Sequence, residues 1–323
     1  MTFRTMTFWT VTSRLMHSLG RLKQGGLALA GASTVAMLSL LSSPALAGDP
    51  FRSSNEYNIG PNAEAAFEAF FKEGDYIRAQ EIIDSALDSE SEEPLVHGLA
   101  ASMAYLDGDF DTMAVHAELT KSTAAALLDT SPLRGHLYSA VGIFLDGAHL
   151  MSTQGVARST PTALGMLQRV FRHLDNAEKI DKTDPELNLV QGFMDLMLAV
   201  NLPFSNPEES IERLAQYSSP SYLTYRGIAL GYRDLDQISD AMVAVDRALQ
   251  AAPENPELFY LKAQLQRRQQ QTADSVDSFD KALTYADQLP PETARMIYRE
   301  RCRTLGGAAD ACGTQAANFV ANL

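Results

Sequence analysis

The chain has 323 residues, of which 46% are hydrophobic, and it carries 26 basic against 40 acidic residues. This hydrophobic share excludes a largely disordered chain. The net charge of −14 argues against sequence-independent binding of nucleic acid, which needs a cationic surface. Residues 1–48 contain four basic residues and no acidic one, so the rest of the chain has 22 basic against 40 acidic residues, a net charge of −18.

Residues 1–47 have the pattern of a secretory signal peptide. Basic residues precede an uncharged stretch, 27–41, that is too short to span a bilayer. Ala45-Leu46-Ala47 then offers a site for a signal peptidase, so we expect a mature chain that begins at Gly48, is exported to the periplasm and has no stable membrane insertion. A thylakoid lumen or the extracellular space is the alternative destination, and an uncleaved anchor is the alternative structure. The translation start is open among three methionines, Met1, Met6 and Met16.

Prolines predict where helices begin, because the missing N–H group costs nothing in the first turn of a helix. Seven of them recur at spacings of 33 to 53 residues: Pro61, Pro94, Pro132, Pro185, Pro220, Pro256 and Pro291. Alternation of apolar and polar residues, which would indicate strands, is nearly absent. We therefore expect an all-α chain, preceded by an extended lead segment at residues 48–60.

A 34-residue period underlies this pattern. Gly74-Asp75-Tyr76 recurs as Gly108-Asp109-Phe110, and four residues of a later helix recur 34 positions on: Ala241, Val245, Ala248 and Leu249 as Ser275, Phe279, Ala282 and Leu283. The spacing i, i+4, i+7, i+8 places each set of four on one helix face. With these motifs the chain resembles a tetratricopeptide-repeat (TPR) protein, and more narrowly it is similar to secreted TPR proteins of cyanobacteria.

The resemblance implies a solenoid of antiparallel helix pairs over residues 61–305, in which each pair stacks on its neighbours. The units at about 132–219 are longer than the period, with a break at Ser152–Gly155 and a second helix expected from Pro161 to Ile180. The segment Pro291–Leu305 is expected to be the capping helix, with Met296 and Ile297 facing inward.

The two cysteines, Cys302 and Cys312, are most simply read as a disulfide in an oxidising compartment. A metal site would need more ligands than this pair offers. The disulfide would tie the C-terminal tail, residues 306–323, to the capping helix.

The resemblance also implies a partner-binding groove lined by the first helix of each pair. Counting from the starting prolines, the predicted groove holds Leu189, Phe193, Leu196, Met197, Ile228, Tyr232, Tyr260, Arg267 and Arg268. Core packing is the alternative role for the apolar members, and a solvated face is the alternative for the arginines. The Lys and Asn residues of the family's groove for C-terminal carboxylates are missing at these positions, so that activity is not expected here.

The sequence motifs that would indicate metal binding or catalysis are incomplete. Asp107–Asp111 imitates a calcium loop, but Thr112 stands where the loop needs Gly. Ser278 and Lys281 have the spacing of a penicillin-binding enzyme without its partner motifs. We therefore expect a non-catalytic protein without cofactors or metal ions that binds another protein or a peptide. The alternatives are an enzyme, or an accessory subunit of one, with a site in the region 132–220, and an envelope binder of small ligands or polymers.

Overall fold

The computed structural model describes residues 6–7, 10–11, 48–201 and 206–323. These residues form fourteen α-helices, two short helical turns and one strand pair. The strands β1 (Met6–Thr7) and β2 (Thr10–Val11) pair antiparallel. Apart from these two strands, the predicted signal peptide lies outside the described residues.

Within residues 61–201 and 206–323, the helices follow one another without intervening strands. Their bounds are α1 Pro61–Glu68, the π-helical turn η1 Ala69–Glu73, α2 Tyr76–Ser89, α3 Pro94–Asp107, α4 Phe110–Ala126, α5 Pro132–Gln154, α6 Val156–Ile180, α7 Pro185–Asn201, α8 Pro207–Tyr217, α9 Ser221–Asp234, α10 Ile238–Ala251, α11 Pro256–Arg268, α12 Thr272–Leu283, the 3₁₀ turn η2 Ala286–Gln288, α13 Pro291–Thr304 and α14 Ala309–Val320.

Local sequence explains where these helices begin and turn. A proline is the first residue of α1, α3, α5, α7, α8, α11 and α13. Gly74 and Gly108 adopt left-handed backbone conformations, with φ of 69° and 70°, which glycine reaches without steric cost. The next residues, Asp75 and Asp109, cap α2 and α4 by accepting backbone N–H groups at 2.9 and 3.1 Å. The Asp109 carboxylate is thereby part of a helix cap.

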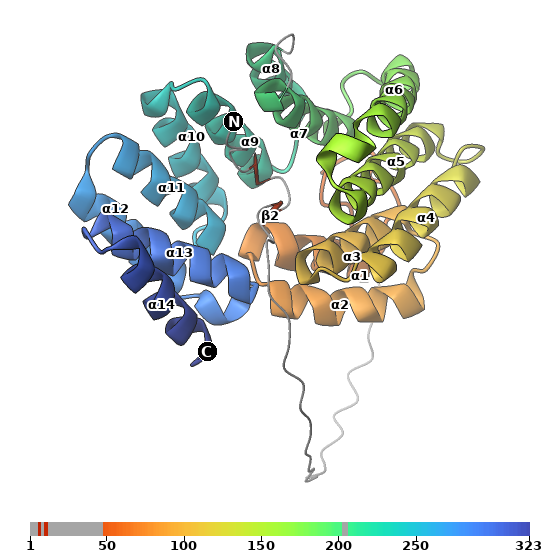
Figure 1. The fold of residues 1–323 in the computed structure, drawn as a ribbon. Coiled ribbons are helices and arrows are strands. Elements are labelled where there is room, and N and C mark those ends of the chain that lie inside the picture. Colours follow the sequence, from red (N-terminus) through yellow and green to blue (C-terminus); the bar gives the residue numbers. More distant parts are fainter. Residues whose placement is uncertain (1–5, 8–9, 12–47, 202–205) are drawn as a thin grey trace, which may run out of the picture.

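Consecutive helices pack as antiparallel pairs, which confirms the predicted all-α fold class. The pairs are α1–α2, α3–α4, α5–α6, α7–α8, α9–α10, α11–α12 and α13–α14. The first helices of neighbouring pairs also touch, as α3 does with α5 and α7 with α9. The odd-numbered helices therefore form an inner layer and the even-numbered ones an outer layer (Figure 1).

The longest pair, α5–α6, corrects one expectation about the irregular region. Its second helix begins at Val156 instead of Pro161, which lies inside α6. The hydroxyl of Ser159 donates to the carbonyl oxygens of Leu150 and Gly155, at 3.0 and 2.8 Å, and holds the turn between the two helices. A proline this close to a helix start removes one backbone hydrogen bond, and α6 continues through it.

The predicted C-terminal tail is a helix. Cys302 in α13 is joined to Cys312 in α14, with their Cα atoms 5.6 Å apart. The rings of Tyr298 and Phe319 stack across the same pair with centroids 4.8 Å apart. Ile297 is fully buried, as expected, and α14 rather than α13 is the last layer of the array.

The array curves until its first unit meets later units, at α9, at the start of α11 and at η2 (Figure 1). The side-chain amide of Asn255, which precedes α11, donates to the carbonyl oxygens of Phe71 and Lys72 in η1, at 3.0 and 3.2 Å. The contacts of α2 with η2 and of α9 with η1 belong to the same interface, which we call the seam of the array. One hydrophobic core consequently runs from Phe51 to Ile297.

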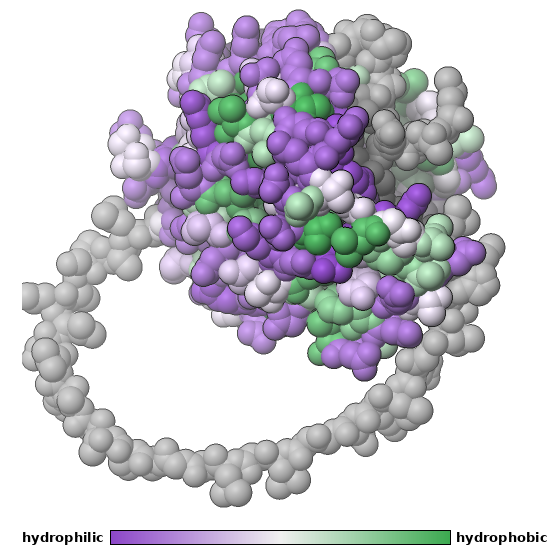
Figure 2. Space-filling view, turned by 90° about the vertical axis from the view of Figure 1, so that its left-hand side faces the viewer, coloured by the Kyte–Doolittle hydropathy of each residue, from purple (hydrophilic) through white to green (hydrophobic). Residues whose placement is uncertain are grey.

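The face that carries the C-terminal helices is mostly hydrophilic, with separate small apolar areas (Figure 2). Apolar side chains are instead gathered between the two helix layers and inside the curve. Among the described residues, none of the helices combines the length and the apolar character that a membrane span requires.

Candidate functional site

The inner layer contains the apolar residues predicted to form a groove, but the closed array buries most of them. The exposed fractions of Leu189, Phe193, Leu196, Ile228 and Tyr260 are 3, 3, 5, 6 and 7%. Met197 and Tyr232 are half-buried. In this conformation the five buried residues pack in the hydrophobic core instead of lining an open groove. Their role in binding a partner stays a prediction.

The two predicted groove arginines are exposed, and each of them contacts another residue of the chain. Arg267 lies 3.1 Å from a carboxylate oxygen of Glu300 in α13. Arg268 donates to the backbone carbonyl oxygen of Arg233 at 2.8 Å. Their charges are therefore partly satisfied by neighbouring units, and the basic end of the predicted groove is less available to an acidic partner than the sequence alone indicates.

The inside of the array holds the lead segment, residues 48–60. Asp49, Phe51 and Ile59 are buried, with exposed fractions of 6, 3 and 2%, although the segment contains neither helix nor strand. Between these anchors the segment bulges outward, and residues 53–56 are exposed. The segment is therefore a loop against the inner helices and not the extended stretch that the sequence predicts, since the Asp49 carboxylate accepts the N–H of Tyr57 at 3.0 Å.

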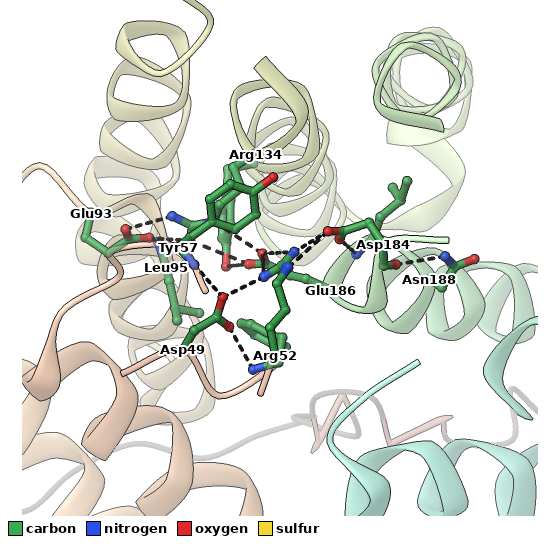
Figure 3. A network of polar contacts seen from close by, with 12 residues as sticks. Asp49, Arg52, Tyr57, Glu93, Leu95, Arg134, Asp184, Glu186 and Asn188 are labelled. Atoms are coloured by element: carbon green, nitrogen blue, oxygen red, sulfur yellow. Dashed lines mark hydrogen bonds and ion pairs between the residues drawn. The ribbon is translucent and has the colours of Figure 1, made fainter. Parts of the chain in front are cut away.

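Arg52 is the main polar anchor of the lead segment (Figure 3). Its guanidinium donates to Asp184 at 3.1 Å, to Glu186 at 3.2 Å and to Asp49 at 2.9 Å. It also lies over the Tyr57 ring, 4.4 Å from the centroid. Since the Arg52 side chain is only 7% exposed, these contacts replace its hydration.

Arg134 of α5 is the array's own cation in the same network. It binds Glu93 in a two-pronged pair at 3.0 and 2.7 Å and reaches Glu186 at 3.2 Å. Glu186 also accepts the hydroxyl of Tyr138 at 2.7 Å. The carboxylate of Glu186, which is fully buried, is therefore shared between the two arginines and connects the lead segment with α5 and α7.

Helix ends position the acidic residues of the network. Glu93 precedes α3 and accepts the backbone N–H of Leu95 at 2.9 Å. Asp184 precedes α7 and accepts the N–H of Leu187, also at 2.9 Å. Because these carboxylates cap the first turns of inner helices, the network lies where the helix starts converge on the inside of the array.

Burial governs the charges in the network. It raises the pKa values of Glu93 and Asp184 above their usual range, although the neighbouring arginines oppose this. For Arg134, burial by itself lowers the pKa, because it disfavours the charged form. The carboxylates of Glu186 and Glu93 outweigh this effect, and the pKa of Arg134 lies above its usual value. Arg52 behaves in the same way beside Glu186 and Asp184. The arginines therefore remain charged, and the two of them face the four carboxylates of Asp49, Glu93, Asp184 and Glu186.

An apolar cavity of about 80 Å³ adjoins the network. Phe51 of the lead segment forms part of its wall and meets Phe67 of α1 edge-on, with ring centroids 4.8 Å apart. Phe193 and Leu189, two of the predicted groove residues, line it from α7. The inner surface thus combines an aromatic-lined cavity with an acidic pocket; Phe51 forms part of the wall of the cavity, and the adjacent Arg52 occupies the acidic pocket.

A second pocket, of about 220 Å³, lies at the seam of the array. Its lining is mixed, with charged side chains from Lys72, Glu73, Asp75 and Glu254 beside Tyr285. Within residues 48–201 and 206–323, no group of three or more His, Cys, Asp or Glu side chains is arranged to hold a metal ion.

Four histidines that are scattered in the sequence meet in pairs. The Nδ1 atoms of His97 and His116 lie 3.3 Å apart between α3 and α4, and those of His136 and His173 lie 3.2 Å apart between α5 and α6. Burial, followed by the partner ring, lowers the pKa of His116 and of His173. Each pair therefore joins the two helices of one unit.

Sequence reasoning missed the buried charge network. One signal for it is present: Glu186 and Glu257 each follow a helix-starting proline, and both are buried and paired with an arginine. An acidic residue at this position also favours a helix start, so the pattern alone does not indicate a buried ion pair.

Solved structures of TPR proteins are distantly similar to this chain. TTC0263, a thermophilic TPR protein of Thermus thermophilus, has a TM-score of 0.30 and 14% identity, with 76% of this chain and 97% of that chain covered. The TPR2AB domain of yeast Sti1, in a complex with pHSP90, has a TM-score of 0.32 and 14% identity, with 79% and 97% covered. No protein-family model and no curated protein matches the chain. The fold described above rests on the chain's own helix pairs.

Proposed function

We propose that this protein is an exported, non-catalytic scaffold that binds another polypeptide on the inner face of its helical array. The observation that carries the proposal is the lead segment: the inner helices already hold a non-helical stretch of polypeptide by burying its side chains and pairing its arginine. Curved helical arrays offer such extended inner surfaces for binding. The narrower similarity to cyanobacterial proteins stays a prediction.

Photo-crosslinking from defined positions tests the binding face. A photoreactive amino acid replaces Tyr232, which is half-buried on inner helix α9, and in a matched control it replaces Val243, which is 56% exposed on outer helix α10. Irradiation in intact cells is expected to yield a discrete adduct from position 232 and none from 243. The captured protein, once purified, should bind the wild-type scaffold in calorimetry. Adducts from position 243 alone, or from neither position, would contradict the proposal.

Export has its own test, because the chain contains one tryptophan, Trp9, inside the predicted signal peptide. Protein collected from the envelope is expected to begin at Gly48 and to lack tryptophan fluorescence. A disulfide between Cys302 and Cys312 agrees with an oxidising compartment. Tryptophan emission from the purified envelope protein would count against cleavage at this site.

A further inference from the structure

The first N–H groups of helix α1 are capped by a residue that lies outside the lead segment. Helix α1 is capped from the opposite side, since Glu90 accepts the backbone N–H groups of Asn62 and Ala63 at 2.9 and 2.7 Å. Gly60, which joins the lead segment to α1, has φ of 111°, a conformation that favours glycine. At the junction, the carbonyl oxygen of Gly60 accepts the N–H of Glu64 at 3.0 Å, and the other capping contacts of α1 come from Glu90.

The site left by the lead segment would demand a cation. The array itself contributes Glu93, Asp184 and Glu186 to the network, with Arg134 as its own counter-charge. Arg134 is already committed to Glu93 and Glu186, whereas Asp184 is paired with Arg52. A planar guanidinium that bridges Asp184 and Glu186 fits this arrangement better than a compact ammonium group.

The residue beside Arg52 adds a second requirement. Phe51 is 3% exposed and packs on Phe67 at the wall of the apolar cavity. The Asp49 carboxylate accepts the backbone N–H groups of Phe51 and Tyr57, at 2.9 and 3.0 Å, and holds the segment in the bent conformation that presents both side chains. The pocket is thus shaped for an aromatic residue followed by arginine in a non-helical segment.

We propose that Phe51-Arg52 is an intramolecular ligand, and that a partner polypeptide binds by placing an aromatic–arginine pair of its own in the same pocket and displacing the lead segment. This inference rests on the proposed function. It adds the chemistry of the partner, an aromatic residue followed by arginine. It also adds a competition between the lead segment and the partner for one pocket, so that the lead segment covers the inner face when no partner is present. The charge complementarity between the pocket and a guanidinium is what selects this occupant.

The test uses a fluorescent peptide with the sequence of residues 48–60 and the full mature chain. In the variant Arg52→Gln the internal ligand is weakened and the pocket is intact, so we expect the peptide to bind at least about tenfold more tightly than to the wild type, as measured by anisotropy. A peptide with glutamine in place of its arginine should bind at least about tenfold more weakly to Arg52→Gln. The double variant Arg52→Gln, Asp184→Asn should lose the binding, because Asn keeps the cap of α7 and removes the carboxylate. Arg78→Gln, which alters an exposed pair with Glu73, is the matched control and should behave as the wild type.

Two results would overturn the inference: an Arg52→Gln protein that melts cooperatively and does not bind the peptide, or peptide binding that is indifferent to the arginine. If Arg52→Gln does not fold, amide hydrogen exchange of the wild type tests whether the lead segment leaves its site independently of the array. Residues 50–59 should exchange while α3, α5 and α7 stay protected; exchange of the lead segment only together with these helices would make it a permanent part of the core and refute the competition. A partner crosslinked at position 232 without any peptide binding would leave the proposed function standing and remove this inference alone.

Discussion

At the scale of single residues, buried charge is the feature with the largest energetic consequence. Arg134 is 3% exposed and binds carboxylates that precede or begin two other inner helices. Removing one partner of a buried ion pair leaves the remaining charges without compensation, and this costs much more than the loss of an exposed pair.

Replacing Arg134 with methionine is expected to lower the free energy of unfolding by about 3–5 kcal/mol, because Glu93 and Glu186 stay buried without their cation. Arg295→Met is the matched control: Arg295 pairs with Glu292 on the exposed side of α13, and its loss should cost about 0–1 kcal/mol. Urea denaturation of both variants measures the difference. Equal losses would show that the network adds no special stability.

Asp195 of α7 makes stability depend on pH. Burial raises its pKa to about 6, and Arg213 opposes this only in part. Since the folded pKa lies above the unfolded value of about 3.9, the folded state binds the proton more tightly, and stability falls as the pH rises from about 4 through 6. Asp195→Asn should therefore stabilise the protein relative to wild type at pH 7.5 and lose this advantage near pH 4. Urea denaturation at both values is the measurement, with the exposed Asp175→Asn as control; an advantage that does not change with pH would contradict the assignment.

At the scale of elements, most helices carry their own start and stop signals. The prolines and the caps at Asp75 and Asp109 act within one turn, and this is why their positions could be read from the sequence. The start of α6 could not, since it depends on Ser159 reaching back to Leu150 in the preceding helix. Helix α14 was missed for a related reason: its short segment is stabilised by the disulfide and by packing on α13.

Reduction of Cys302–Cys312 is expected to loosen α14 and leave the rest of the array intact. The bond closes a short loop, and opening it should cost about 2–3 kcal/mol by restoring freedom to the unfolded chain. Thiol titration of the denatured, unreduced protein should find no free thiol. After reduction, amide hydrogen exchange should accelerate in α14 and stay unchanged in α3 and α5. Two free thiols before reduction, or unchanged protection of α14 after it, would contradict this expectation.

At the scale of the whole molecule, the decisive feature is the closure of the array upon itself. Asn255 has two roles in it: its side-chain oxygen accepts the N–H groups of Glu257 and Leu258 at the start of α11, and its amide donates across the seam to Phe71 and Lys72. A single fully buried side chain therefore links the cap of α11 to the contact between that unit and the first one.

Asn255→Asp separates these roles. Aspartate keeps the cap of α11 but cannot donate to the two carbonyl oxygens in η1, so we expect a loss of about 1–3 kcal/mol in the free energy of unfolding. Asp109→Asn exchanges the same two residue types at the cap of α4, away from the seam, and should change stability by less than about 0.5 kcal/mol. Urea denaturation of both variants provides the comparison. Similar small effects would mean that the seam contributes little.

The sequence by itself determined the all-α class, most helix starts and the partnership of Cys302 with Cys312, because these features depend on residues close together in the chain. The tertiary structure decided what the inner face contains. Arg52 meets Asp184 across 132 positions, and Asn255 meets Phe71 across 184. A repeat period describes how each unit packs on the next, and it carries no information on how far the array curves or which segment enters it. Phe193 and Ile228 could therefore be assigned to inner helices from the sequence, whereas their burial in the core was decided by the tertiary structure.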